Sequence, residues 1–332
     1  MILNQLIKHS SQQVLLPFYH LVSSSVPSYA KHLYKPRNIN QFKEDLDLFL
    51  AHYQAINLEE VIALTHHPKQ LKKPAFHLTF DDGLANFYDE IAPILIAKNI
   101  SATIFLNTAF VDNKDLFYRY KASLLITHYL DSNEDVRDEY WNFFGKRQEA
   151  RGEKQEARNK RQEIFQFLLS ITYENKVILD ELADCVNYSF SDYLKTEKPY
   201  LTTQQIKELQ QKGFTFGAHS VDHPLYANLS LVAQLQQTKS SLEWLQKQIQ
   251  PKHSVFSFPF HDIGVTNDFF DEISNDLSIS FGTSGFKKEN VWFHLHRLDM
   301  EKSKGSTKRF LINNYLKLVL KTPFGKHKVT RK

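Results

Sequence analysis

The chain has 332 residues, of which 42% are hydrophobic, and its 26 Phe and 15 Tyr can fill a sizeable core, so wholesale disorder is excluded. Its ten glycines form no G-x-G-x-x-G or phosphate-loop pattern, which argues against the common nucleotide sites, and its one cysteine excludes an internal disulfide. Residues 301–332 hold ten Lys or Arg and one acid, so the first 300 residues carry a net charge of −5 within the total of +4, and a nucleic-acid-binding core is not indicated.

Strand and helix signals alternate over the first hundred residues, as a parallel α/β sheet requires. Asn40 is the expected N-cap of the first helix, and Pro93 is expected to kink a later one. The predicted elements are a strand at 14–21, helices at 40–53 and 58–64, a strand at 75–80, a helix at about 87–95 and a strand at 102–106.

The apolar stretch at 14–22 follows Lys8 and has two interpretations, a secretory signal or a buried strand. Pro17 and His20 interrupt the stretch, which favours the strand. The chain contains no run of 18 apolar residues, so a membrane-spanning helix is not expected. We therefore expect a protein that is cytoplasmic or peripheral to the membrane, with export as the alternative.

The alternation stops at about 111–199, where a helical insertion is predicted. Its charged run at 145–162 indicates a solvated helix face, and both a surface excursion and a lid or substrate-binding lobe remain open. The alternation then resumes. The predicted elements are a helix at 204–212 capped by Thr202 or Thr203, a strand at 214–218, a helix at 231–249, and strands at 255–258 and 277–281.

Two clusters of reactive side chains follow predicted strands, where parallel α/β proteins build their sites. Asp81 and Asp82 come directly after the strand at 75–80, so one carboxylate can bind a metal while its neighbour accepts a proton. An ordinary Asp-Gly turn that caps a helix is the alternative.

His219 and His223 follow the strand at 214–218. At this spacing they are expected on one side of a helical turn, close enough to share a metal ion. A capping histidine beside a surface histidine is the alternative. Two histidines and a carboxylate suit hydrolytic zinc but also non-haem iron, so this donor set alone leaves the metal open.

Together, these motifs resemble the polysaccharide deacetylase family, also called the NodB-homology domain or carbohydrate esterase family four. The resemblance extends to other segments and covers most of 14–108 and 200–300. It implies a distorted (β/α) barrel of about seven strands, with 1–332 as a single deacetylase domain that carries the helical insertion. The motifs that carry it are T-F-D-D-G at 79–83, H-S-V-D-H at 219–223, Y-H at 19–20, A-T-I-F at 102–105 and F-P-F at 258–260.

This resemblance implies that Asp82, His219 and His223 are the metal ligands and that Asp81 is the general base. The cofactor implied is Zn²⁺ or another divalent metal such as Co²⁺, whose bound water attacks the acetamide carbonyl.

Phe260 and Pro259 match family positions at the acyl pocket, and the backbone N–H of Phe260 is expected to help to hold the oxyanion. A packed strand end is the alternative for both residues. The family often has an Arg two residues before this Pro, which tethers the base, but this chain has Ser257 there. Arg297 is our candidate for the missing guanidinium.

The family's general acid, a His in an L-x-x-H context, has no clean match. His294 and His296 are the candidates, and His296 is favoured because it adjoins Arg297. His261 is a further option, and exposed strand histidines are the alternative reading of 294 and 296.

The basic segment at about 305–332 carries an apolar stripe and predicts a closing helix packed on the domain. A peripheral contact with a membrane or an anionic polymer is the alternative for this segment.

We therefore predict a metal-dependent hydrolase of C–N non-peptide bonds. It would remove acetyl groups from N-acetylated sugars, of the N-acetylglucosamine type, in a polysaccharide or glycan intermediate. The alternatives are a glycan-binding relic that keeps the metal, a hydrolase of another amide or an O-acetyl ester, and, more remotely, an iron oxygenase. The expected partner is the carbohydrate, with no nucleic acid.

Overall fold

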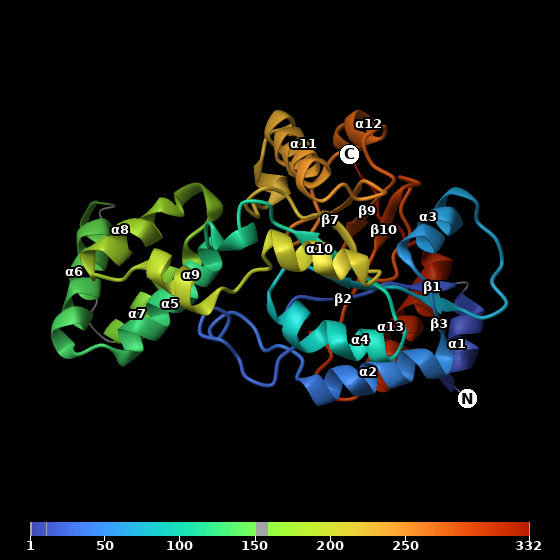
Figure 1. Ribbon diagram of the computed structural model, residues 1–332, viewed down its shortest axis with the longest axis horizontal. Helices are drawn as coiled ribbons and strands as arrows, with labels where there is room; N and C mark the ends of the chain where they lie inside the picture. The colour runs from blue at the N-terminus through green and yellow to red at the C-terminus, as the bar shows by residue number, and fades with distance from the viewer. Residues whose placement is uncertain (1, 11, 151–158, 332) are drawn as a thin grey trace. The chain divides into compact units, whose positions relative to one another are not determined.

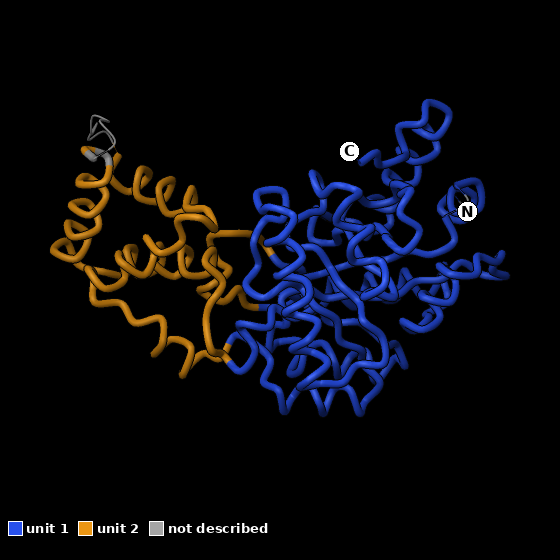
Figure 2. The backbone as a smooth tube through the Cα atoms, turned by 90° about the horizontal axis from the view of Figure 1, so that it is seen from above, with its two compact units in different colours: residues 1–24, 36–112, 199–332 blue, residues 25–35, 113–198 orange. Residues whose placement is uncertain are grey.

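The computed structural model describes residues 2–10, 12–150 and 159–331. The chain forms two compact units, shown in different colours in Figure 2. The first unit, here called the barrel unit, comprises 1–24, 36–112 and 199–332. The second, here called the helical unit, comprises 25–35 and 113–198.

Eight strands of the described chain form the main sheet of the barrel unit, and every neighbouring pair is parallel. The strands that end the sheet order, β10 and β11, are separated in sequence by Arg297 alone, so the two edges of the sheet must lie close together. The sheet therefore curves into a nearly closed barrel with helices outside it (Figure 1), which confirms the predicted fold with eight strands in place of about seven. The order is β10 (His294–His296), β9 (Ile279–Gly282), β8 (Val255–Ser257), β7 (Thr215–Ala218), β6 (Ala102–Leu106), β5 (Leu78–Phe80), β2 (Pro17–Tyr19) and β11 (Leu298–Asp299).

A second, three-stranded parallel sheet shares chain segments with the barrel. In the strand predicted at 14–21, residues 14–15 belong to the small sheet and residues 17–19 to the barrel, with Leu16 between them. In the strand predicted at 75–80, residues 75–76 belong to the small sheet and residues 78–80 to the barrel, with His77 between them. Each of these predicted strands therefore serves both sheets. The small sheet has the order β1 (Val14–Leu15), β4 (Ala75–Phe76), β3 (Gln54–Ala55).

In the barrel unit, the helices predicted at 40–53, 58–64, 204–212 and 231–249 begin within one residue of their observed positions, whereas the helices at 2–10 and 267–273 were not predicted. Asn38 rather than Asn40 caps α2, since its side chain and that of Gln41 form a reciprocal capping box. Pro93 lies in the first turn of α4, which follows a π-helical segment at Phe87–Ile91 without a break, so the helix predicted at about 87–95 changes its geometry just before Pro93. The helices are α1 (Ile2–Ser10), α2 (Ile39–His52), α3 (Leu58–His66), α4 (Ala92–Ala97), α10 (Thr203–Gln211), α11 (Leu231–Gln248), α12 (Asn267–Ile273) and α13 (Thr307–Lys321).

The segment at 305–332 contains α13, which packs against α1. Leu311, Tyr315 and Leu318 are buried, while Leu316 and Leu320 remain exposed. Among the described helices, none has the length and apolar character needed to cross a membrane.

The helical unit is built from five described α-helices and from the segment 25–35, which precedes α2 in the chain. Ser123 in α5 donates a hydrogen bond to the Ser28 carbonyl, and His32 contacts Thr127 at 3.1 Å, so the early segment packs on that helix. Residues 151–158 of the predicted charged helix face lie outside the described residues. The helices are α5 (Tyr118–Asp131), α6 (Glu134–Ala150), α7 (Lys160–Ser170), α8 (Val177–Cys185) and α9 (Phe190–Glu197).

His77, buried between β4 and β5, predicts a pH-dependent stability. Its Nδ1 donates to the Ile56 carbonyl at 2.9 Å, its Nε2 lies 2.8 Å from the Thr103 hydroxyl, and burial lowers the pKa of His77 from 6.5 to about 4. Below pH 6.5 the unfolded chain therefore binds a proton that the folded chain excludes, and stability falls as the pH drops towards 4.

We expect this group to remove up to about 3 kcal/mol of unfolding free energy between pH 6.5 and 4. His77→Gln should show a flatter pH dependence in urea titrations, whereas exposed His67→Gln should follow the wild type. Equal slopes for all three proteins would contradict the prediction.

Candidate active site

The candidate site lies at the carboxyl ends of neighbouring barrel strands. Asp81 and Asp82 follow β5, and His219 follows β7, two strands away in the sheet. The Asp81 N–H donates to the Tyr19 carbonyl at 2.9 Å, and the His219 N–H donates to the Leu106 carbonyl at 2.8 Å. Parallel pairing thus brings residues from distant parts of the chain to one end of the barrel.

The turn after β5 separates the two aspartates. Asp82 and Gly83 both have positive φ, 69° and 61°, a conformation that L side chains rarely adopt. A Cβ on Gly83 would lie 2.6 Å from Leu106 Cδ2, so a side chain there would displace Leu106 in addition to straining the backbone. Strained backbone at Asp82, directly beside the reactive groups, is typical of a functional site.

The segment from His219 to His223 is a loop, so the expected helical turn does not form. Ser220 and His223 have positive φ, 68° and 64°, which folds the loop back on itself. The Asn107 side chain donates to the His219 carbonyl, and the Ala109 N–H donates to the Val221 carbonyl, so the end of β6 holds the loop. The two imidazoles meet because of this loop geometry.

Asp82, His219 and His223 converge on a small volume. His219 Nε2 lies 3.6 Å and His223 Nε2 lies 3.3 Å from Asp82 Oδ1, and all three side chains are buried. Burial raises the pKa of Asp82, but the hydrogen bond and charge of His223 outweigh it and hold that pKa below its ordinary value. One donor atom from each residue lies within 4.8 Å of the others, a spacing that suits one metal ion.

The tautomer of His219 tests whether this cluster suits a metal. Its Nδ1 lies 2.7 Å from the Ser257 carbonyl, which can only accept, so Nδ1 carries the proton and Nε2 presents a lone pair. His219 Nε2 is buried and has no hydrogen-bond partner within the described ranges. Burial lowers the pKa of His219 to about 4, so the imidazole is neutral, as a ligand must be. The residues present therefore fit a divalent cation.

Asp81 faces a different partner, Arg297. Two parallel hydrogen bonds of 2.7 Å join the guanidinium to the two carboxylate oxygens, and both side chains are buried. Burial raises the pKa of Asp81, but the charge of Arg297 outweighs it and lowers that pKa below its ordinary value. Asp81 is therefore held as a carboxylate with a fixed orientation.

Arg297 lies at the seam of the barrel, between β10 and β11, and its side chain is fully buried. It donates to Ser257 Oγ at 2.5 Å and to Thr79 Oγ1 at 3.0 Å. Ser257, which stands where the family often has Arg, thus contacts an arginine from another strand. The guanidinium carbon also lies within 6 Å of three aromatic ring centres, those of Phe18, Phe105 and Phe281.

Phe260 borders the cluster, and Pro259 is buried beside it. The Phe260 ring centre lies 4.6 Å from that of His223, and 36% of the residue is exposed. Its φ of 57° is again left-handed. Phe260 therefore presents a partly exposed aromatic face next to the three candidate ligands.

His296 groups with other residues, away from Asp81 and Asp82. It is buried, its Nε2 lies 3.5 Å from Glu289 Oε2, and its donor atoms cluster with those of Asp262 and His294. The alternative, that His294 and His296 are exposed strand histidines, also does not hold, because both side chains are buried. Adjacent strand residues point to opposite faces, so His296 cannot follow Arg297 to Asp81.

His20 is a functional candidate that the sequence analysis did not single out for catalysis. It lies one residue past β2, and because Tyr19 pairs with Phe80, it is level with Asp81. Its Nδ1 donates to Glu301 at 2.8 Å. Burial lowers the pKa of His20, but the charge and hydrogen bond of Glu301 outweigh it and raise that pKa to about 10. The signal was available, since the first strand ends in Tyr19-His20 beside the strand that ends in the aspartates.

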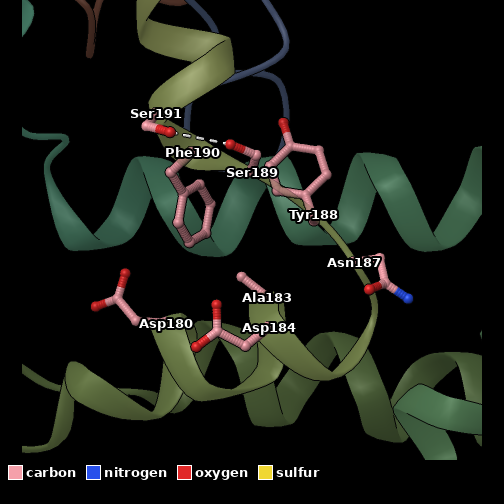
Figure 3. Close-up of a pocket in the computed structure, with 8 residues that line it drawn as sticks. All are labelled: Asp180, Ala183, Asp184, Asn187, Tyr188, Ser189, Phe190 and Ser191. Carbon is pink, nitrogen blue, oxygen red and sulfur yellow. Dashed lines mark hydrogen bonds between the residues drawn. The ribbon is translucent and has the colours of Figure 1, made fainter.

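A separate pocket of about 420 Å³ lies in the helical unit (Figure 3). Its lining combines carboxylate, amide, hydroxyl and aromatic side chains, but it includes none of the predicted site residues. The lining residues are Asp180, Ala183, Asp184, Asn187, Tyr188, Ser189, Phe190 and Ser191.

The family model for polysaccharide deacetylases matches residues 69–140 and 171–280, together more than half of the chain. The chain therefore belongs to the polysaccharide deacetylase family. The comparison with curated proteins finds no match.

Solved structures share the fold at low identity. The deacetylase PplD of Streptococcus pyogenes, solved with acetate, is 17% identical with a TM-score of 0.55, covering 92% of this chain and 97% of its own. A de-N-acetylase from Aggregatibacter actinomycetemcomitans is 15% identical with a TM-score of 0.53 (90% and 99% covered). IcaB from Ammonifex degensii is 14% identical with a TM-score of 0.52 (91% and 96% covered). These likenesses show the common barrel fold.

Proposed function

We propose that this protein is a metal-dependent hydrolase that removes acetyl groups from N-acetylated sugars of a polysaccharide or glycan intermediate. Membership of the polysaccharide deacetylase family makes it a deacetylase-type hydrolase with a carbohydrate substrate. The observation that carries the finer proposal is the convergence of Asp82, His219 and His223 beside a carboxylate, Asp81, held by a buried guanidinium.

Each side chain has a distinct task in this proposal. Asp82, His219 and His223 would hold the divalent ion, for which zinc or cobalt suits the donor set. When bound, such an ion polarises a carbonyl and lowers the pKa of water. Asp81 accepts the proton of the attacking water, and Arg297 keeps it ionised and oriented. Phe260 forms one wall of the acyl pocket.

His20 is the residue to which we assign proton donation to the leaving amine. An amine leaves an amide poorly unless its nitrogen is protonated, so a cationic group near the site has a clear use. Glu301 binds Nδ1 of His20, so the proton transferred would be that on Nε2. The position of His20 level with Asp81, across neighbouring strands, supports the assignment.

We expect His20→Gln to lower the kcat for N-acetyl substrates by about 10²–10⁴-fold. It should lower acetate release from an aryl acetate far less, because a phenolate leaves without protonation. Rates for both substrate types, measured with wild type and variant, check this. Equal losses on the two substrates would contradict a role in protonation.

The proposed function is tested by acetate release from a panel of N-acetylated oligosaccharides. The protein is first stripped of metal with a chelator, and Zn²⁺ or Co²⁺ is then added back while bound metal is measured. Release that requires the metal supports the proposal. Release from O-acetyl esters alone would favour the esterase alternative, and no release from metal-loaded protein would contradict the proposal.

A further inference from the structure

A second buried cluster lies outside the candidate active site. Asp262, Glu289, His294 and His296 place donor atoms within 4.8 Å of one another, a donor set that also suits a metal. A guanidinium, that of Arg331, already lies among them. Its Nε and Nη2 donate to Glu289 Oε2 at 2.9 and 2.8 Å, and Nη2 also donates to Asp262 Oδ2. Arg331 thus places a positive charge between the two carboxylates.

The same guanidinium also binds the backbone of the loop that follows Phe260. Arg331 Nη1 donates to the carbonyls of Asp262 and Val265, at 2.9 and 3.1 Å. Its guanidinium carbon lies over the Phe270 ring, 4.6 Å from the ring centre, and its side chain is 3% exposed. One side chain therefore uses its planar set of donors to fix both ends of the segment 262–265.

Backbone pairing brings Arg331 to this position. The Lys288 N–H donates to the His327 carbonyl, and the Val329 N–H donates to the Lys288 carbonyl, both at 2.8 Å. Asn267 Nδ2 also contacts the Arg331 carbonyl at 3.4 Å. The segment 327–331 is therefore docked along its length, and the contacts of Arg331 do not depend on its side chain alone.

The loop fixed by Arg331 leads directly to the acyl-pocket wall. Asp262 Oδ1 accepts from the Thr283 N–H at 3.2 Å, and Thr283 Oγ1 donates to the Phe260 carbonyl at 3.4 Å. Gly282 permits this packing, since a Cβ there would lie 2.3 Å from Asp262 Oδ1. Phe260, in its left-handed conformation, then contacts His223. A non-glycine residue keeps such a conformation only where its surroundings hold it.

We propose that Arg331 is a positioning residue that holds the loop 259–265, and with it the Phe260 wall, so that the pocket accepts an acetyl group and rejects larger acyl groups. This inference rests on the proposed function, because it concerns the acyl pocket of that site. In this proposal the cluster of Asp262, Glu289, His294 and His296 binds the guanidinium of Arg331 and is not a second metal site.

The test compares the wild type with Arg331→Met, Arg331→Lys and the exposed control Lys328→Ala. A close-fitting pocket distinguishes acyl groups that differ by one methylene by roughly tenfold or more. We expect this preference for N-acetyl over N-propionyl sugar to approach parity in Arg331→Met, with kcat/KM for the acetyl substrate falling on the order of tenfold. Arg331→Lys keeps the charge but cannot span all the acceptors, so its preference should be intermediate. Lys328→Ala should match the wild type.

Hydrogen–deuterium exchange gives a readout that needs no substrate. Peptides covering 259–266 should exchange faster in Arg331→Met than in the wild type or Lys328→Ala, with strand peptides such as β6 unchanged. Unchanged selectivity and exchange in Arg331→Met would overturn the inference. So would a second bound metal in the wild type that Glu289→Gln removes. If the wild type released no acetate, the proposed function would fail, while the exchange data would still decide whether Arg331 holds the loop.

Discussion

Asp81→Asn is expected to keep its bound metal and to lose acetate release by about 10²–10⁴-fold, the usual contribution of a general base. The amide has nearly the shape of the carboxylate but accepts no proton at neutral pH. Asp81 contacts Arg297 and is not one of the three candidate ligands, which are Asp82, His219 and His223. The substitution should therefore separate proton transfer from metal binding.

The matched control is Asp82→Asn, one residue further along. It removes a charged ligand, so we expect it to lower metal occupancy together with turnover. Metal content and kcat of both variants, measured on the same preparations, check the prediction. If Asp81→Asn released acetate at the wild-type rate, another group would have to act as the base.

Arg297→Met is expected to have the second-largest effect, on stability and turnover together. It leaves the Asp81 carboxylate buried without its partner, which typically costs about 3–5 kcal/mol of unfolding free energy. The three rings around the guanidinium would also lose their cation. We expect kcat to fall because an unpaired, buried Asp81 is driven towards its protonated form, in which it cannot act as a base.

The double variant Arg297→Met with Asp81→Asn separates these causes. Removing both charges should recover much of the stability that Arg297→Met loses, while turnover stays low. Urea titrations of the wild type, both single variants and the double variant give the coupling between the two sites. Additive losses would show that the ion pair contributes little, and wild-type turnover in Arg297→Met would refute the orienting role.

Short sequence patterns predicted the parts of the site that depend on consecutive residues. Asp81-Asp82-Gly83 after a strand, and His219 and His223 after a later one, were visible because parallel strands present their carboxyl ends together. The local conformation was harder to predict. The histidine loop is shaped by positive φ at Ser220 and His223, which no periodicity signals.

Other features depended on the order of strands and were not predictable locally. His20 and Asp81 are 61 positions apart in the chain yet level in the barrel, because β2 pairs with β5. His296 was favoured as the acid for its place beside Arg297, but neighbouring strand residues face opposite ways. By its position in the sequence, the segment 25–35 belongs to the first α/β region. Its contacts in the structure nevertheless assign it to the helical unit.

By itself, the sequence determined the alternation of strands and helices and the two motifs that supply the aspartates and histidines, because these follow from local hydrophobic patterns and from side chains at strand ends. The resemblance of those motifs to the polysaccharide deacetylase family implied the barrel. The tertiary structure alone decided two other relationships: His20 lies level with Asp81, and Arg331 binds the backbone of the loop after Phe260. It also brings Arg297, the guanidinium suggested by the sequence, into contact with Asp81. The physical reason is that a buried charge is placed by the partners that compensate it, and those partners come from whichever strands the closed sheet brings together.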